Sequence, residues 1–323
     1  MFTLCYIINY KYHFGGGSMP NWNEVLREIN AQQYEQQHNA NALDIVRRKY
    51  LKSISEATGR NTIAYYSGFL QKPGLEQTSI NDDDKNGFMT VINKLDRNKG
   101  LDLILHTPGG DIAAAESIVD YIRRMFGNDV RAIVPQIAMS AGTMIACSCK
   151  YIIMGKESNL GPIDPQFGGI PASGVIEEFK TACEETAKHP EHIPMWSIVI
   201  SKYHPTFIGE CEKAIEWSQQ MVKGWLMRNM FADEAFPEVN ALKVVEHFGS
   251  HEETKAHNRH INIDECERTG LKIKHLENIH QDKNFQDLVL STHHAYMHTF
   301  SNSSSVKIIE NQNGIAVVQH YNG

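Results

Sequence analysis

The chain has 323 residues, of which 41% are hydrophobic and 21% are charged, so it is long enough to bury one large core with a smaller appendage. Its formal net charge of −7 and its pI near 6.1 argue against a nucleic-acid partner, because no basic stripe is present to hold phosphates. The sequence has no run of about twenty apolar residues of the kind that spans a membrane.

The first eighteen residues differ in composition from the rest of the chain. Residues 2–14 are rich in aromatic and apolar side chains, and Gly15-Gly16-Gly17-Ser18 is typical of an engineered flexible linker, with Met19 as the expected original start. The apolar part is too short for a secretory signal core and has no small-residue cleavage site. We expect residues 1–18 to be an engineered peptide with its linker, and residues 2–14 to be a tethered substrate or binding partner that adds as a strand.

Residues 19–59 are expected to form an N-terminal helical extension. Residues 22–59 fit one or two polar helices that end at Gly59, and their apolar face carries Leu43, Val46, Tyr50 and Leu51. A first strand is expected at residues 62–66, followed by a loop at residues 71–81. The acidic turn Asp82-Asp83-Asp84 predicts a solvated cap for a helix over residues 86–98, since its spacing is not that of an EF-hand calcium loop.

A glycine turn follows the second predicted strand. Residues 101–105 form a short apolar run with polar or turn-forming neighbours, which is typical of a buried parallel strand. Pro108 fixes a bend, and Gly109 and Gly110 allow backbone angles that a side chain would forbid, so free amides are expected to face a ligand there. A helix is predicted from Asp111, with apolar residues spaced three or four apart.

The same strand, loop and helix pattern repeats around Ser140. A strand over residues 131–136 leads through small residues 138–146 into a second helix, and a third strand is predicted at residues 150–154. Ser140 is thus expected near a helix N-terminus, where backbone amides favour an anion. This order predicts an α/β fold with right-handed crossovers and a mostly parallel sheet, whose ligands bind at the carboxyl ends of the strands.

The remaining elements are predicted to be mainly helical. A charged helix over residues 172–188 is broken at residues 190–194, and a longer helix over residues 207–228 carries Trp217, Met221 and Trp225 as core or subunit contacts. Residues 264–276 fit a helix and a strand at residues 270–273, and residues 314–321 fit a last strand. We therefore divide the chain after its helical extension into a core at residues 60–192 and a C-terminal region at residues 193–323.

The two turns together are the halves of a serine acyl-transfer site. Amides of Gly109 or Gly110 and of Ala141 are expected to hold an oxyanion, and the Ser140 hydroxyl is the nucleophile that creates it. No cofactor and no metal are expected. The six cysteines have no framework spacing, which favours reduced thiols and a cytoplasmic location: Cys5, Cys147, Cys149, Cys183, Cys211 and Cys266.

These motifs resemble the Clp-peptidase and crotonase superfamily, in which Pro108-Gly109-Gly110 is similar to the oxyanion loop and Met139-Ser140-Ala141-Gly142 to the nucleophile turn. The runs His106-Thr107-Pro108-Gly109-Gly110, residues 138–143 and residues 161–166 more narrowly resemble the serine dehydrogenase proteinase family, related to signal peptide peptidase A. The resemblance is dense over residues 60–169 and looser beyond residue 193. It implies a spiral of βαβ units with helical extensions, a homo-oligomer, and a serine peptidase that cleaves unfolded or flexible polypeptide through an acyl-enzyme.

The general base is left open by the sequence. Clp peptidases have a histidine where this chain resembles them at Asp164, so the usual serine-histidine pair is broken. We rank His251 first as the base, because imidazole titrates near neutrality, with Asp164 orienting it. Lys180, or less readily Lys156, is the alternative, since related signal peptide peptidases use serine-lysine dyads; the glutamates around Lys180 would keep it charged.

Other functions stay open beside the peptidase. His251, His257 and His260 fit surface histidines or, less well, a zinc site, because no carboxylate or cysteine completes the ligand set on one helix face. A crotonase-type acyl-CoA enzyme would use the same amide pair for an enolate, would not need Ser140, and would need a basic pocket for the nucleotide phosphates. A noncatalytic peptide-binding or assembly module would keep the fold without a working base.

Overall fold

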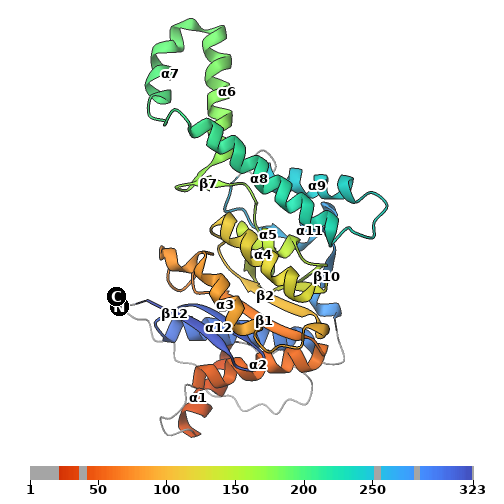
Figure 1. Cartoon of the computed structure of the whole chain (residues 1–323). Coiled ribbons are helices and arrows are strands. Elements are labelled where there is room, and N and C mark those ends of the chain that lie inside the picture. The colour runs from red at the N-terminus through yellow and green to blue at the C-terminus, as the bar shows by residue number, and fades with distance from the viewer. Residues whose placement is uncertain (1–21, 36–41, 251–255, 280–283, 322–323) are drawn as a thin grey trace.

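A seven-stranded sheet forms the centre of the molecule (Figure 1). The computed structural model describes residues 22–35, 42–250, 256–279 and 284–321. Within them the strand order is β10-β5-β3-β2-β1-β11-β12. The strands are β1 (Asn61–Ser67), β2 (Leu101–His106), β3 (Val130–Val134), β5 (Ile152–Met154), β10 (Ile273–His275), β11 (Ser305–Asn311) and β12 (Ala316–His320).

The sheet is mostly parallel, as predicted. Strands β1, β2, β3, β5 and β10 pair in parallel, whereas β11 runs antiparallel to β1 and β12 antiparallel to β11. The strands predicted at residues 62–66, 101–105, 131–136 and 150–154 are confirmed, with ends shifted by one or two residues. The carboxyl ends of β2 and β3 therefore face the same edge of the sheet, where the glycine and serine turns lie.

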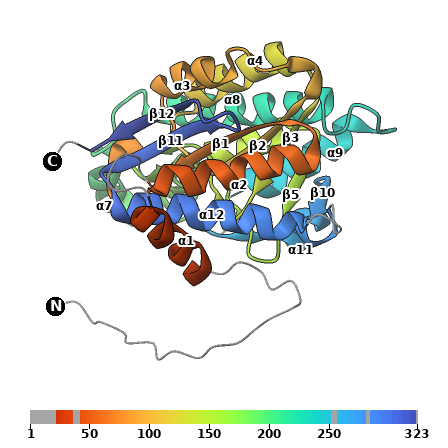
Figure 2. The same cartoon turned by 90° about the horizontal axis from the view of Figure 1, so that it is seen from below.

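Helices cover both faces of the sheet (Figure 2). Successive strand residues point to opposite faces, so Leu103 and Leu105 of β2 join one apolar cluster and Ile104 joins the other. The first cluster includes α3 (Asp83–Ile92), α4 (Ile112–Phe126) and α5 (Ala141–Cys147); the second includes α2 (Ala42–Thr58) and α12 (Phe285–Asn302). Both faces are thus closed to solvent by packed side chains.

The N-terminal helices lie on the α12 side of the sheet. Helix α1 (Trp22–Glu35) shares a small apolar cluster with α2 and α12, to which Val25, Val46 and Ala295 contribute. Residues 1–21 lie outside the described residues, so the structure does not test the predictions for residues 1–18 or the tethered peptide at residues 2–14.

The acidic turn differs from its prediction. Helix α3 begins at Asp83, and Asp82 at its N-cap makes no capping hydrogen bond with its side chain. Asp84 is fully buried and forms an ion pair with Lys307 of β11. The prediction of a solvated cap is therefore wrong for Asp84, because the partner that neutralises it lies more than two hundred residues away in the chain.

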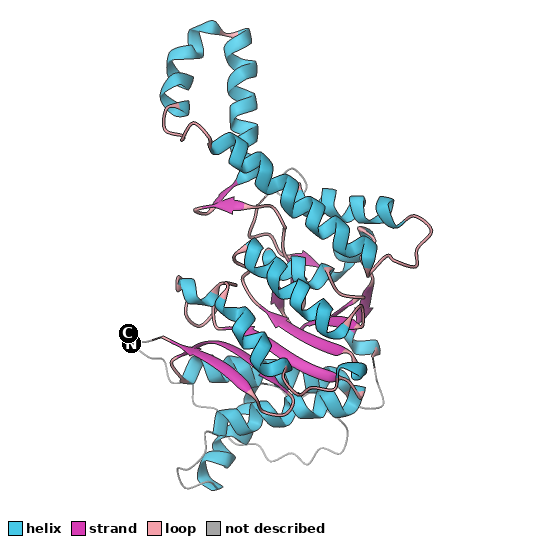
Figure 3. Ribbon diagram, in the orientation of Figure 1, coloured by secondary structure: helices cyan, strands magenta, loops and turns pink. Residues whose placement is uncertain are grey.

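An arm of helices stands away from the sheet (Figure 3). It consists of α6 (Ala172–Lys188), the 3-10 turn η3 (Pro190–His192) and α7 (Ile193–Ile200), from which α8 (Phe207–Arg228) leads back to the body. The predicted break near residue 190 is confirmed by η3. Met221 and Trp225 of α8 are buried in the core, whereas Trp217 is 41% exposed.

Shorter elements complete the described part of the chain. Three two-residue strands form a second sheet in the order β4-β6-β9: β4 (Ile137–Ala138), β6 (Asn159–Leu160) and β9 (Ile261–Asn262). The others are β7 (Gln166–Phe167), β8 (Ile170–Pro171), α9 (Pro237–Gly249), α11 (Ile263–Arg268), η1 (Glu76–Thr78), η2 (Arg97–Lys99) and η4 (Leu276–Asn278). Among the helices that the structure describes, none combines the length and the apolar character that a membrane span needs.

Candidate active site

The glycine turn after β2 lies directly against the serine turn. Gly109 has φ of 95°, and a Cβ atom placed on it would lie 2.7 Å from both the carbonyl oxygen of Met139 and the Cβ of Ser140. Only glycine permits that approach, because real Cβ atoms do not come so close to other heavy atoms. The sequence prediction that this turn brings backbone close to a ligand or neighbour thus has a steric basis.

Residue Ile80, in the loop before α3, fixes the orientation of the glycine turn. The Ile80 N–H donates to the Gly109 carbonyl at 2.8 Å, and the Asp111 N–H donates to the Ile80 carbonyl at 2.9 Å. Gly110 has φ of 150°, and a Cβ there would lie 2.4 Å from the Ile80 backbone. Because N–H and C=O point in opposite directions in a trans peptide, the Gly110 N–H points away from Ile80.

Ser140 sits in an unusual backbone conformation at the start of α5. Its φ is 49° and its ψ is −118°, a region that side chains rarely adopt and that is found mainly at functional sites. Ala141, the next residue, is fully buried, and its N–H has no acceptor in the part of the chain that the structure describes. A buried amide without an acceptor is costly, so this donor is available to a ligand oxygen.

Hydrogen bonds tie the serine turn to both neighbouring segments. The Thr107 N–H donates to the Ile137 carbonyl at 3.1 Å, and the Met139 N–H donates to the Thr107 carbonyl at 3.0 Å. The Thr143 hydroxyl donates to the Ala138 carbonyl at 2.8 Å and accepts from the Gly161 N–H at 2.9 Å. The glycine turn, the serine turn and the segment leading to Asp164 are therefore held in one fixed arrangement.

The three-stranded sheet brings the remaining side chains to Ser140. Strand β4 ends two residues before Ser140, and β6, its parallel partner, ends four residues before Asp164. Strand β9 pairs antiparallel with β6 and begins four residues after His257. An antiparallel partner presents its start where the other strand ends, so His257 and Asp164 meet on the same side as Ser140.

Asp164 holds His257 by a short hydrogen bond. The distance from His257 Nδ1 to Asp164 Oδ1 is 2.7 Å, and the Asp164 side chain is 1% exposed while that of His257 is 20% exposed. A carboxylate that accepts from Nδ1–H fixes the tautomer in which Nε2 is free to accept a proton. This is the tautomer that a histidine general base requires.

A pocket of about 470 Å³ lies over these groups. Ser140, Gly109, Gly110 and His257 all line it. Among the residues that the structure describes, the rest of the lining includes apolar side chains and neither lysine nor arginine: Ser79, Pro108, Asp111, Ile112, Ala113, Pro165, Gln166, Phe167, Ala214 and Trp217. Within the described residues, no cluster of histidine, cysteine or carboxylate side chains has the arrangement of a metal site.

The two lysine candidates are not brought into this pocket. Lys180 is exposed on α6 in the arm, and Lys156 is exposed in the turn after β5, where its N–H donates to Glu277. His251 lies outside the described residues, so its pairing with Asp164 stays a prediction. His260 lies within the described residues and is exposed.

Reasoning from the sequence alone did not identify His257 as the histidine that pairs with Asp164. The histidines at 251, 257 and 260 share one polar segment, and no periodicity separates them. The only local signal is the apolar alternation of Ile261 and Ile263, which marks where the buried strand β9 begins and which histidines precede it.

Two archaeal proteins are similar in sequence to part of this chain. The chain is 33% identical over 140 residues to the uncharacterized protein MJ0137 of Methanocaldococcus jannaschii, a match that covers 42% of this chain and 48% of the relative. It is 31% identical over 138 residues to MJ1495 of the same organism, covering 41% and 46%. The matches therefore span about half the length of these relatives.

A family model covers much more of the chain. It matches residues 29–281, which include the glycine turn, the serine turn, Asp164 and His257. The match confirms the resemblance drawn from the three sequence runs, and the mostly parallel sheet agrees with it. The chain belongs to the ClpP-like SDH-type serine proteinases.

Proposed function

We propose that the chain is a serine endopeptidase in which Ser140, His257 and Asp164 act as a catalytic triad. The Ser140 hydroxyl attacks the scissile carbonyl while His257 Nε2 takes its proton, and Asp164 stabilises the imidazolium that forms. His257 then donates this proton to the leaving amine, which leaves an acyl-enzyme on Ser140. Water hydrolyses the ester by the same proton transfers in reverse order.

The oxyanion is held by main-chain amides in this proposal. The N–H groups of Ala141 and of Gly110 or Gly109 would donate to the carbonyl oxygen as it becomes negative. Gly110 is the better second donor, because the Gly109 N–H already donates to the Thr107 hydroxyl at 3.2 Å. The observation that carries the proposal is that one pocket is lined by Ser140, the two glycines and a histidine already hydrogen-bonded to a buried carboxylate.

The pocket lining favours a polypeptide substrate over an acyl-CoA. A crotonase-type enzyme needs positive charge for the nucleotide phosphates, whereas the described residues that line this pocket include no lysine or arginine. Ile112, Phe167 and Trp217 instead offer apolar surface to a substrate side chain. We therefore infer an extended segment of a flexible or unfolded polypeptide, bound largely through its main chain. Homo-oligomeric assembly and a cytoplasmic location remain proposals that rest on the resemblance and on cysteine usage.

A fluorophosphonate probe tests the nucleophile. We expect covalent labelling that is lost in Ser140→Ala, because only an activated serine reacts with such a probe. Mass spectrometry of the labelled peptide locates the adduct. Labelling that persists in Ser140→Ala, or its complete absence from the unaltered chain between pH 6 and 9, would favour the noncatalytic module.

Three single substitutions assign the base, with His260 as the matched control. His257→Gln should lower the labelling rate by about 10²- to 10⁴-fold, because it removes the proton acceptor while keeping a similar volume. His260→Gln alters an exposed histidine three residues away and should retain the rate. If His251→Gln or Lys180→Ala lowers the rate and His257→Gln does not, the base assignment passes to that residue.

A further inference from the structure

A buried ion pair lies beside the loop that contacts the glycine turn. Lys307 of β11 is 1% exposed and Asp84 of α3 is fully buried, and Nζ lies 2.8 and 3.0 Å from the two carboxylate oxygens. The Tyr65 hydroxyl donates to Asp84 at 2.7 Å. Removing two charges from water is costly, so a pair buried this deeply needs further polar contacts to offset the loss of hydration.

Those further contacts hold residues 79–81, the Ile80 segment. Lys307 Nζ donates to the Ser79 carbonyl at 2.6 Å, and Asp84 Oδ2 accepts from the Asn81 N–H at 3.0 Å. The two charges therefore fix the carbonyl before Ile80 and the amide after it. Because charge-assisted hydrogen bonds are roughly twice as strong as neutral ones, the Ile80 backbone has little freedom between these two points.

The Ile80 segment in turn fixes the peptide between Gly109 and Gly110. Ile80 donates to Gly109 and accepts from Asp111, and its backbone occupies the space where a Gly110 side chain would be. Any rotation of the Gly109–Gly110 peptide would break the hydrogen bond to the Gly109 carbonyl. The direction of the Gly110 N–H is thus set by a contact on the opposite side of the peptide from the pocket.

We propose that Lys307 and Asp84 are positioning residues for the oxyanion donor, acting through the Ile80 segment. The proposal rests on the function proposed above for Ser140 and the glycine turn. Neither charged side chain lines the pocket, so their loss should leave substrate binding nearly unchanged and should slow the chemical step.

The double variant Lys307→Met/Asp84→Asn tests the proposal, because it removes both charges together and leaves no unpaired ion. The maximal labelling rate of Ser140 by a fluorophosphonate should fall about 10- to 100-fold, while the probe concentration for half-maximal rate changes by less than about twofold. Hydrogen exchange at the Ile80 and Asp111 amides, measured by mass spectrometry, should become faster.

The matched control is Arg47→Met/Glu310→Gln. Arg47 and Glu310 are both fully buried, and Arg47 Nε lies 2.6 Å from Glu310 Oε2. The Glu310 side chain points to the opposite face of β11 from Lys307, toward α2 and α12. This variant should lose stability without losing the maximal labelling rate. Equal rates and equal exchange in the two double variants would overturn the proposal.

One further outcome separates this proposal from the proposed function. If the unaltered chain is not labelled at all, the peptidase mechanism fails, while hydrogen exchange still decides whether the ion pair holds the glycine turn.

If the double variant does not fold, Ser67→Ala is used instead, because the Ser67 hydroxyl donates to the Thr78 carbonyl at 2.6 Å. It should slow labelling about threefold, and an unchanged rate would count against the proposal.

Discussion

Ser140 is held in a backbone conformation that opposes stability. Its φ is 49°, and a residue with a side chain adopts this backbone conformation at a cost of about 1 to 3 kcal/mol in stability. The surrounding hydrogen bonds from Thr107 and Thr143 over-determine the turn and keep it in place. Such strain turns the side chain out toward the pocket instead of into the first turn of α5.

Replacing Ser140 by glycine should therefore stabilise the chain relative to replacing it by alanine. Glycine relieves about 1 to 3 kcal/mol of strain and loses about 0.5 to 1 kcal/mol to greater freedom in the unfolded chain. The Ser140→Gly variant should exceed Ser140→Ala by about 1 kcal/mol in the free energy of unfolding. Both variants lack the nucleophile, so denaturant titration compares them without self-cleavage. A less stable glycine variant would show that the turn is not strained.

His106, the last residue of β2, should make stability depend on pH. It is fully buried against Tyr66, Phe69 and His293, and burial lowers its pKa from 6.5 to about 3. Below pH 6.5 the unfolded chain takes up a proton that the folded chain does not. The free energy of unfolding should therefore fall on acidification, by about 1.4 kcal/mol per pH unit from this residue between pH 6.5 and pH 3.

The variant His106→Leu checks this assignment. Between pH 6.5 and pH 5 it should lose about 2 kcal/mol less stability than the unaltered chain, as measured by urea unfolding. Between pH 7 and pH 8 the two chains should respond alike to pH, because the histidine is neutral in both states. His293, whose pKa burial also lowers, keeps part of the slope in the variant. Identical slopes in the acid range would contradict the prediction.

At the scale of elements, what could be predicted from the sequence depends on how local the cause is. The turn at Gly109 and the turn at Ser140 each follow a strand and open a helix, so apolar periodicity and glycine chemistry were enough to predict them. His257 could not be distinguished from its neighbours. Its place depends on the pairing of β6 with β9, two residues long each, and such short strands leave no periodic pattern.

Strand β11 shows the same limit for charged residues. Its seven residues are all buried, yet Lys307 and Glu310 interrupt the apolar pattern by which a buried strand is recognised. Each is neutralised by a distant partner, Asp84 for one and Arg47 for the other. Since the partners come from α3 and α2, only the folded structure shows that these charges belong to the core.

Gly142 of α5 packs directly against the methyl group of Thr107, the residue that follows β2. A Cβ on Gly142 would lie 2.4 Å from Thr107 Cγ2, so Gly142→Ala should push the serine turn away from the glycine turn. We expect a loss of about 1 to 3 kcal/mol in stability and a slower labelling of Ser140. Thermal unfolding and the fluorophosphonate rate measure the two effects.

The second-site variant Thr107→Ser should restore both properties. Serine lacks the methyl group but keeps the hydroxyl that accepts from the Gly109 N–H. The double variant Gly142→Ala/Thr107→Ser should thus recover most of the rate, whereas Thr107→Ser alone should change little. If the double variant is as slow as Gly142→Ala, the defect lies in the helix itself and not in this contact.

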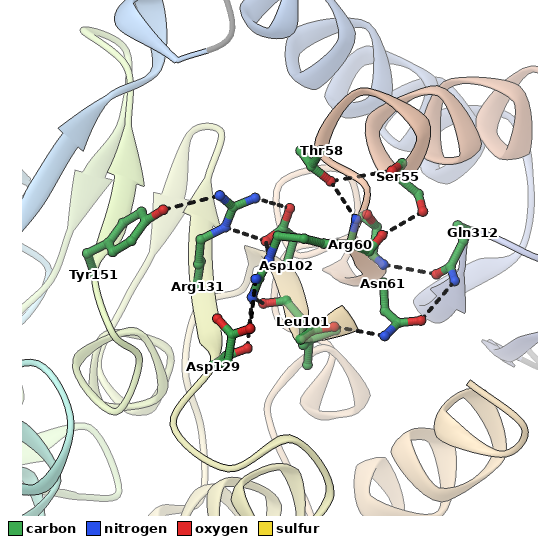
Figure 4. A network of polar contacts seen from close by, with 12 residues as sticks. Ser55, Thr58, Arg60, Asn61, Leu101, Asp102, Asp129, Arg131, Tyr151 and Gln312 are labelled. Carbon is green, nitrogen blue, oxygen red and sulfur yellow. Dashed lines mark hydrogen bonds and ion pairs between the residues drawn. The ribbon is translucent and has the colours of Figure 1, made fainter. Parts of the chain in front are cut away.

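On the scale of the whole molecule, the carboxyl ends and the amino ends of the parallel strands carry different groups of residues. The carboxyl ends of β2 and β4 carry the glycine and serine turns, whereas a polar network ties the amino ends of β1, β2, β3 and β5 together (Figure 4). Asp102 is fully buried at its centre and accepts from Arg60 at 2.8 Å and from Arg131 at 2.5 Å. Arg131 also donates to the Tyr151 hydroxyl at 3.1 Å, which extends the network to the start of β5.

Asp102→Asn should accordingly lower stability without slowing the chemistry at the opposite edge. Two largely buried guanidinium groups lose the Asp102 carboxylate that they share, which costs about 3 to 5 kcal/mol. Asp129→Asn is the control, because Asp129 also pairs with Arg60 but is 49% exposed and should cost less than about 1 kcal/mol. Denaturant midpoints measure the first effect, and Ser140 labelling well below both transitions measures the second. A large fall in labelling rate for folded Asp102→Asn would show that the strands transmit strain from one edge to the other.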